Sequence, residues 1–253
     1  MNSDFPNQYL RLRAQRLMES TREFQARGKS VIRCESCQLG RFACLCPWRP
    51  SFDTQCEFVL LMHRDEVFKP TNSGRLIADV FPHRTHVFCW SRTEPVPELL
   101  ALLSDPGRRC VIVFPADANE GAANPRELIH ELPDDGKITT FILLDGTWKQ
   151  SGRMFHLSRW LDAIPSVALP EALMRGYAVR KSHQEHYLST AEAAGLCLQM
   201  AGELTAAEVV FNYFQVFNVH YLATRNAVPP VIGDLHQRLA PFSNAGSVQA
   251  GGQ

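Results

Sequence analysis

The chain has 253 residues, of which 45% are hydrophobic and 21% are charged, and its 26 basic residues balance 26 acidic ones. This composition is typical of a globular protein with room for one large α/β domain and a small attachment. No apolar run approaches the roughly 18 residues that a membrane helix requires, and the N-terminal residues lack the apolar core of a secretory signal. We therefore expect a cytoplasmic protein without a membrane partner.

Positive charge is concentrated near the N-terminus. Residues 11–49 contain nine Arg or Lys residues against three Glu residues. Leu10, Leu17 and Phe24 recur at sevenfold spacing within residues 9–27, which predicts one amphipathic basic helix. A basic arm favours a polyanionic partner, although a solvated helix face would have the same composition.

The cysteines fall into two groups, and one group is compact. Cys34, Cys37, Cys44 and Cys46 lie within thirteen residues, as Cys-x-x-Cys followed by Cys-x-Cys. This spacing is typical of two short knuckles around one tetrahedral Zn²⁺, with redox pairs and an iron–sulfur cluster as alternatives. Four thiolates leave no open position, so we predict a structural zinc ion. Trp48 and the neighbouring arginines are candidates for contacts with nucleic acid.

Strand-like and helix-like segments alternate from Cys56 onward. Strand patterns cover residues 56–63, 85–90, 110–114 and 139–144, with a short one at 165–170. Helical patterns cover residues 75–81, 97–104, 126–132, 149–158, 191–201 and 205–225. The alternation predicts an α/β fold with a mostly parallel sheet and helices on both faces.

The same patterns suggest where the chain divides. We expect an N-terminal arm at residues 1–50, with the basic helix and the cysteines, followed by one α/β catalytic domain at residues 51–230. Residues 231–253 have the composition of a disordered end, so we predict a flexible tail there.

Residues 139–150 join the central strand pattern to a polar turn. The apolar run from Phe141 ends on Asp145, and Gly146, Thr147 and Trp148 then lead into a helical pattern. Ligands of open α/β sheets collect beyond the carboxyl ends of the strands. Asp145 is therefore a candidate catalytic residue, although an N-cap of the following helix would explain it equally well.

Other polar segments also occupy predicted strand ends. The stretch from His63 to Gly74 follows the first strand, and Pro115 begins a loop after the third. Ser189 and Thr190 begin a helix whose free N–H groups would attract a carboxylate or phosphate, although capping alone would account for them. Nucleotide-binding glycine loops, the serine-hydrolase elbow and the H-E-x-x-H zinc pair are absent, which disfavours those reactions. His183 and His186 lie in a basic tract and are interpreted as surface or RNA-facing residues.

The motifs together resemble a known family. Asp145-Gly146-Thr147-Trp148 is similar to the D-x-T-W motif of the DTW-domain proteins. The four-cysteine arm and the KPTNSGRL, FPADA and LSTAEA segments follow in that family's order, so the resemblance covers roughly residues 30–225. It implies a SPOUT-like α/β fold, a superfamily in which the C-terminal part can form a deep knot.

The resemblance, which is strongest to the bacterial members, also implies an activity. Such proteins transfer the 3-amino-3-carboxypropyl group of S-adenosylmethionine to N3 of a uridine in the variable loop of tRNA and release methylthioadenosine. Asp145, Thr147 and Trp148 would then be catalytic, with Asp145 as the base. Because an ordinary Asp with a pKa near ~3.9 is a weak base, burial beside Trp148 would help by raising that pKa.

The co-substrate would be held by backbone and side chains at the strand ends and at the helix entry. The expected residues are Pro115, Ala116, Asp117, Ala118, Leu143, Leu144, Ser189 and Thr190. Arg75 or Arg180 would pair with the methionine carboxylate. The tRNA and S-adenosylmethionine are the expected partners, and no DNA partner is expected.

Two other functions remain open at this stage. A SPOUT-type RNA methyltransferase would use the same fold and cofactor but attack the methyl carbon. A non-catalytic zinc-knuckle RNA-binding protein would use only the basic helix and the cysteines, and it would not need a carboxylate directed into a crevice.

Overall fold

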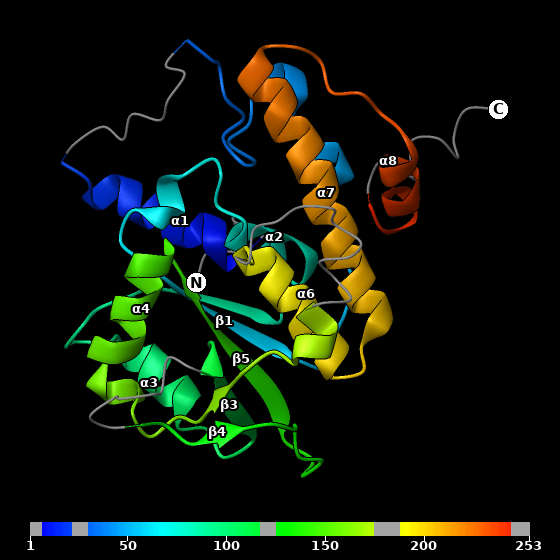
Figure 1. Cartoon of the computed structure of the whole chain (residues 1–253). Coiled ribbons are helices and arrows are strands. Elements are labelled where there is room, and N and C mark those ends of the chain that lie inside the picture. Colours follow the sequence, from blue (N-terminus) through cyan, green and yellow to red (C-terminus); the bar gives the residue numbers. More distant parts are fainter. Residues whose placement is uncertain (1–6, 22–29, 117–124, 175–187, 244–253) are drawn as a thin grey trace.

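The computed structural model describes residues 7–21, 30–116, 125–174 and 188–243, and its centre is one parallel sheet (Figure 1). Its strands are β1 (Glu57–Met62), β2 (Thr85–Cys89), β3 (Arg108–Val113), β4 (Leu128–Ile129), β5 (Ile138–Asp145) and β6 (Ser166–Val167). They lie in the order β2-β1-β5-β3-β6-β4, and every paired neighbour is parallel. The predicted α/β class and parallel sheet are confirmed.

Strands β1 and β5 are neighbours in the interior of the sheet, and both are apolar along most of their length. Every residue of β1 is buried, as are Thr140 to Asp145 of β5. Buried runs without polar alternation are typical of strands covered on both faces. Their register pairs Met62 with Asp145, so the two strands end side by side.

Helices cover both faces of the sheet and create two hydrophobic clusters. The helices are α1 (Gln8–Glu19), α2 (Gly74–Val80), α3 (Pro97–Leu103), α4 (Trp148–Leu157), α6 (Thr190–Met200), α7 (Leu204–Asn226) and α8 (Asp234–Leu239). Alternate residues of β1 point to opposite faces, so Phe58 and Leu60 pack with α2, α6 and α7, whereas Val59 and Leu61 pack with α3 and α4. Figure 1 shows these two layers on either side of the strands.

The N-terminal arm packs against the long helix α7. It contains two short 3₁₀ turns: Arg41–Ala43, between Cys37 and Cys44, and Cys46–Trp48, which begins at the last of the four cysteines. The backbone N–H of Gly40 donates to Thr224 Oγ1 at 3.0 Å, and Trp48 lies edge-on to His236 with ring centroids 4.8 Å apart. The arm is therefore continuous with the core, and Trp48 is engaged in an intramolecular contact.

Two sequence predictions are wrong. Residues 126–132 do not form a helix, because Leu128 and Ile129 pair with β6 as the edge strand β4. Prolines at positions 125 and 133 bracket this short segment, and its pairing with β6 overrides the helical pattern. The predicted flexible tail is wrong for residues 234–243, which form α8 and a 3₁₀ turn with Leu239 fully buried. Composition does not reveal this helix, because a few apolar residues are enough to hold a short helix against a core that other elements have already formed.

The basic N-terminal helix is shorter than predicted among the described residues. It ends at Glu19, capped by Ser20, and residues 22–29 lie outside the described part of the chain. None of the helices in the described ranges is both long enough and apolar enough to span a bilayer.

Candidate active site

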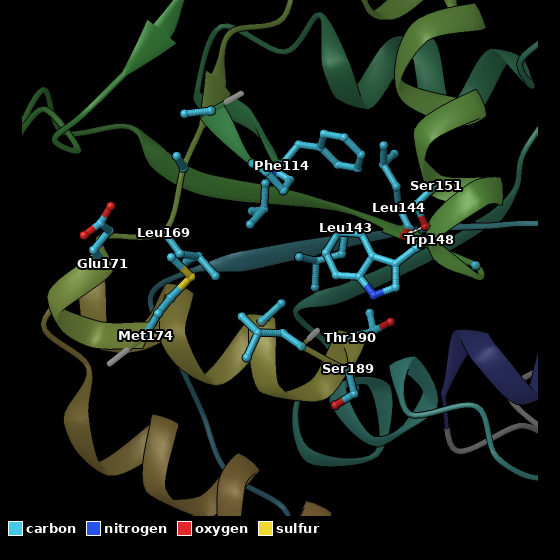
Figure 2. Close-up of a pocket in the computed structure, with 17 residues that line it drawn as sticks. Phe114, Leu143, Leu144, Trp148, Ser151, Leu169, Glu171, Met174, Ser189 and Thr190 are labelled. Carbon is cyan, nitrogen blue, oxygen red and sulfur yellow. Dashed lines mark hydrogen bonds between the residues drawn. The ribbon is translucent and has the colours of Figure 1, made fainter. Parts of the chain in front are cut away.

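A pocket of about 530 Å³ opens beyond the carboxyl ends of β3, β5 and β6, between α4 and α6 (Figure 2). This is the crevice where ligands of open α/β sheets collect, and its volume suits a small organic molecule. Figure 2 shows Trp148, Ser189 and Thr190 at one end of the pocket and Leu169, Glu171 and Met174 at the other. The predicted residues that line it are Pro115, Ala116, Leu143, Leu144, Trp148, Ser189 and Thr190.

Asp145 lies at the end of β5, behind the pocket wall. Its side chain is buried, with only 3% of the residue exposed. Asn72 Nδ2 donates to Oδ2 at 2.7 Å, and Thr190 Oγ1 donates to Oδ1 at 2.7 Å. Since Thr190 also lines the pocket, one hydroxyl group connects the cavity with the carboxylate.

The position of this carboxylate depends on a glycine. A Cβ atom on Gly74 would lie 2.5 Å from Asp145 Oδ2, which no side chain could tolerate without displacing the carboxylate. Gly74 is the first residue of α2, directly after the loop that contains Asn72. The KPTNSGRL segment thus supplies both the amide that binds Asp145 and the space that admits it.

The surroundings of Asp145 change its proton affinity. Burial raises the pKa of Asp145 to about 6, although the hydrogen bonds from Asn72 and Thr190 oppose the rise. Near neutral pH this group is ionised yet far more basic than an exposed Asp, which is the property that a general base requires.

Helix α4 begins with a cap that is not Asp145. Thr147 is the N-cap, its side chain accepts from the N–H of Gln150 at 3.4 Å, and the Gln150 side chain accepts from the N–H of Thr147 at 2.8 Å. Asp145 is therefore not the N-cap of α4, contrary to the alternative explanation of this residue. Trp148, 44% exposed, begins the helix at the pocket rim.

The entry of helix α6 forms another part of the wall. Ser189 is the N-cap and forms a reciprocal capping box with Glu192. Ser73 Oγ accepts from the N–H of Ala191 at 3.4 Å, so the first free N–H groups are partly satisfied inside the protein. Ser189 therefore both caps the helix and lines the pocket, whereas Thr190 lines the pocket and donates to Asp145.

Arg75 is not part of the pocket. Its guanidinium is buried between the N-terminal arm and α7, where Nη1 donates to the carbonyl of Cys37 and the carbon Cζ lies 5.2 Å from the centre of the Phe217 ring. The predicted pairing of Arg75 with a ligand carboxylate is thus not supported by this geometry. Asp117, Ala118, Arg180, His183 and His186 lie outside the described residues.

Sequence reasoning missed several contacts around Asp145. Asn72 lies in the polar segment from His63 to Gly74, but nothing in the sequence distinguishes it from its polar neighbours. His63 follows β1, where its N–H donates to the carbonyl of Asp145 at 2.8 Å and its Nδ1 lies 3.0 Å from Gln150 Nε2. Strands β1 and β5 end at paired residues, Met62 and Asp145, so the residue that follows β1 must lie near the end of β5.

The four clustered cysteines converge on one point. Their Sγ atoms all lie within 4.8 Å of one another, with Cys34 and Cys46 3.7 Å apart and Cys37 and Cys44 3.8 Å apart. These distances exceed the roughly 2.05 Å of a disulfide. They match the edge of a tetrahedron of sulfur atoms, about 3.8 Å, around an ion with bonds of about 2.3 Å. The cluster could therefore hold a metal ion.

Comparisons with known proteins agree with the motif pattern. The profile of a family described as DTW domain matches residues 31–222. Relatives include two proteins named tRNA-uridine aminocarboxypropyltransferase 2, from Macaca fascicularis at 26% identity and from Mus musculus at 27%. Each match spans 172 residues, which are 66% of this chain and 55% of the relative, so the chain matches about half of their length. No solved structure gives a significant match.

Proposed function

Because the chain belongs to the DTW-domain family, we propose that it transfers the 3-amino-3-carboxypropyl group of S-adenosylmethionine to N3 of a uridine in tRNA. The names of the two mammalian relatives support this reaction class. The observation that carries the proposal is the buried carboxylate of Asp145, joined through Thr190 to the wall of a pocket of suitable size.

The pocket offers a mixed surface to S-adenosylmethionine. Phe114, Leu143 and Leu144 provide an apolar wall, and Trp148 offers an aromatic face for the adenine ring. The entry of α6 at Ser189 and Thr190 presents the positive end of a helix toward the methionine carboxylate. Backbone groups of Pro115 and Ala116, after β3, would also contact the bound S-adenosylmethionine.

Asp145 would accept the proton of uracil N3 through the Thr190 hydroxyl, because the carboxylate itself lies behind the pocket wall. The new bond joins N3 to the γ-carbon of the methionine moiety as the bond from that carbon to sulfur breaks, and methylthioadenosine leaves with the electron pair. The proton passes to Asp145, whose raised pKa suits a base that works near neutral pH. Since sulfonium is already a good leaving group, the main task of the protein is alignment of the γ-carbon with N3.

Thr147 and Trp148 contribute differently to this proposal. Thr147 caps α4 and thereby fixes the turn after Asp145. Trp148 stands half-exposed at the rim, where it can contact both the co-substrate and the incoming base. A uridine in a tRNA loop can reach this rim because loops unstack their bases at low cost.

The cysteine cluster is proposed to bind a structural Zn²⁺. The four thiolates of Cys34, Cys37, Cys44 and Cys46 suit tetrahedral zinc, and a complete sulfur shell leaves no position for a substrate. The ion would fold the arm and hold it against α7. Arg33 and Arg41 belong to the same arm and add positive charge for a tRNA backbone.

Three further assignments belong to the same proposal. A tRNA substrate and a thiolate-bound ion favour a cytoplasmic location. The parallel sheet with helices on both faces supports a SPOUT-like classification. The C-terminal knot that the family resemblance implies stays a prediction.

The reaction can be tested with two labelled batches of S-adenosylmethionine. One carries the label in the carboxyl carbon and the other in the methyl carbon, and each is incubated with the protein and unmodified tRNA. The proposal requires carboxyl label in the RNA without methyl label. Methyl label alone would identify a methyltransferase, and tRNA binding with neither label would identify a binding protein.

A further inference from the structure

Arg75 occupies an unusual electrostatic position. The residue is only 2% exposed, and no carboxylate oxygen lies within 4 Å of its guanidinium among the described residues. Nη1 donates to the carbonyl of Cys37, whereas Nη2 is buried without a hydrogen-bond partner in the same part of the chain. A buried cation is costly unless an opposite charge compensates it.

The cysteine cluster would supply that charge. Zinc bound by four thiolates carries a net charge of two negative units, because the thiolates outweigh the dication. A second, half-buried cation faces the same cluster, since Arg49 Nη2 lies 4.0 Å from Cys46 Sγ. Arg49 also has a direct carboxylate partner, Asp79 Oδ1 at 3.0 Å from Nε, whereas Arg75 interacts with Asp79 only at longer range. Arg75 therefore depends more than Arg49 on the metal centre for a compensating charge.

The backbone of Arg75 leads in the opposite direction, toward Asp145. Its N–H donates to Asn72 Oδ1 at 3.0 Å, and Asn72 Nδ2 donates to Asp145 Oδ2 at 2.7 Å. With the amide oxygen of Asn72 engaged by this N–H, its NH₂ group must face the carboxylate. Because Gly74 packs closely against Asp145 Oδ2, a small movement of Arg75 and its neighbour Gly74 would displace the carboxylate.

We propose that Arg75 couples the metal site of the N-terminal arm to the catalytic carboxylate. The side chain compensates and contacts the cysteine cluster, and the backbone N–H orients Asn72, which in turn positions Asp145. Loading of the metal site thereby maintains the geometry of the base. This inference rests on the proposed function for its catalytic part. Arg75 acts here as a positioning residue, not as a ligand of the substrate.

The test compares three variants with the wild-type protein. Arg75→Met removes the charge and the donors, Arg75→Lys keeps the charge, and Arg126→Met removes a different buried arginine. Arg126 is the matched control, because it is 6% exposed, pairs with Asp162 at 3.0 Å and packs on Phe155, far from the cysteines in sequence. For each protein we would measure zinc transfer to a chromophoric chelator, S-adenosylmethionine affinity and kcat.

Arg75→Met should bind zinc about 10- to 100-fold more weakly, as expected when a group that supports metal ligands is removed. Its kcat should fall about tenfold with co-substrate affinity within about twofold of wild type, since only the base is misplaced. Arg75→Lys should recover zinc retention, and Arg126→Met should retain zinc like wild type. Equal zinc loss in Arg75→Met and Arg126→Met, or wild-type retention in Arg75→Met, would overturn the proposal.

Two measurements keep the test decisive if Arg75→Met does not fold or if no transfer occurs. In chelated wild-type protein, kcat should fall while co-substrate binding persists, and an unchanged kcat would contradict the coupling. Carbon-13 NMR of the Asp145 carboxyl should show its pKa rising in chelated protein as the Asn72 bond weakens, and staying near the wild-type value in metal-loaded Arg75→Lys. A rise without any transfer activity supports the coupling and rejects the proposed function. Full transfer with no response at Asp145 rejects the coupling alone.

Discussion

Two buried aspartates, Asp79 and Asp145, lie on the same side of the sheet, but their surroundings suit them to different roles. Asp79, in α2, accepts from Asn7 Nδ2 at 2.8 Å and from Tyr213 Oη at 3.0 Å, and its Oδ1 lies 3.0 Å from Arg49 Nε. Asp145 has two neutral donors, Asn72 and Thr190, and has no cation within 4 Å among the described residues. A cation beside a carboxylate favours its charge and weakens it as a base, whereas neutral donors leave it able to accept a proton.

The two carboxylates also differ in access. Burial raises the pKa of Asp79, but Arg49 opposes this rise, and the group lies among α1, α2 and α7. Burial raises the pKa of Asp145 to about 6, and its hydroxyl partner Thr190 lines a pocket. The comparison favours a structural role for Asp79 in the helical layer and is consistent with the proposed role of Asp145 as the base.

The largest expected effect is on transfer by Asp145→Asn. Loss of a general base should lower kcat by about 10²- to 10⁴-fold, because the amide cannot accept the N3 proton. Co-substrate affinity should change little, since Asp145 is behind the pocket wall. Kinetics with carboxyl-labelled S-adenosylmethionine, together with calorimetric binding, measure the two quantities. A variant with wild-type kcat would remove Asp145 from the mechanism.

Asp79→Asn should produce the opposite pattern. The substitution leaves the half-buried Arg49 without its carboxylate partner, and loss of one member of a largely buried ion pair costs up to about 3 kcal/mol. Urea denaturation should therefore show a lower free energy of unfolding, while kcat per folded molecule stays near wild type. If Asp79→Asn is as inactive as Asp145→Asn but fully stable, the proposed division between the two aspartates is incorrect.

Gly74→Ala tests the space around Asp145 without changing its chemistry. The added Cβ would meet Oδ2 at 2.5 Å, so the carboxylate must move. Misplacement of a catalytic group by about 1 Å can cost up to 10²-fold, and we expect a loss of kcat of about 10-fold or more. Gly152→Ala is the matched control, because no atom lies within 4 Å of a Cβ at that helical position.

The smallest effect concerns stability as a function of pH. The pKa of Asp145 rises from 3.8 to about 6 on folding, so the folded state binds the proton more tightly. This contribution to stability is fully present below pH 3.8 and is lost as pH rises through 6, by about 3 kcal/mol at most. The free energy of unfolding of wild type relative to Asp145→Asn should therefore decrease between pH 4 and 7. A difference that is constant over this range would mean that the pKa is not raised.

The sequence alone predicted those features that depend on local pattern. The apolar run that ends at Asp145 indicated a central strand and a site at its end, and the spacing of Cys34, Cys37, Cys44 and Cys46 indicated a cluster. Ser189 was recognisable as a helix entry because capping is a local interaction.

Features that depend on tertiary contacts escaped sequence reasoning. The role of Asn72 requires knowledge that α2 lies beside the end of β5, and the direction of Arg75 requires knowledge that the cysteine arm lies behind α2. Residues 126–132 have apolar residues at helical spacing, but pairing with β6 determines their structure. The helix α8 is held by contacts such as His236 with Trp48, which no local pattern reveals.

The pH dependence of single-turnover transfer tests the role of Asp145 most directly. Wild-type protein saturated with carboxyl-labelled S-adenosylmethionine and tRNA would be followed between pH 5 and 8.5. The account predicts a rate that falls about tenfold per pH unit below an apparent pKa near 6 and is level above it, because the base is then fully ionised. A rate that keeps rising through pH 8 would show that hydroxide, and not Asp145, removes the proton from N3.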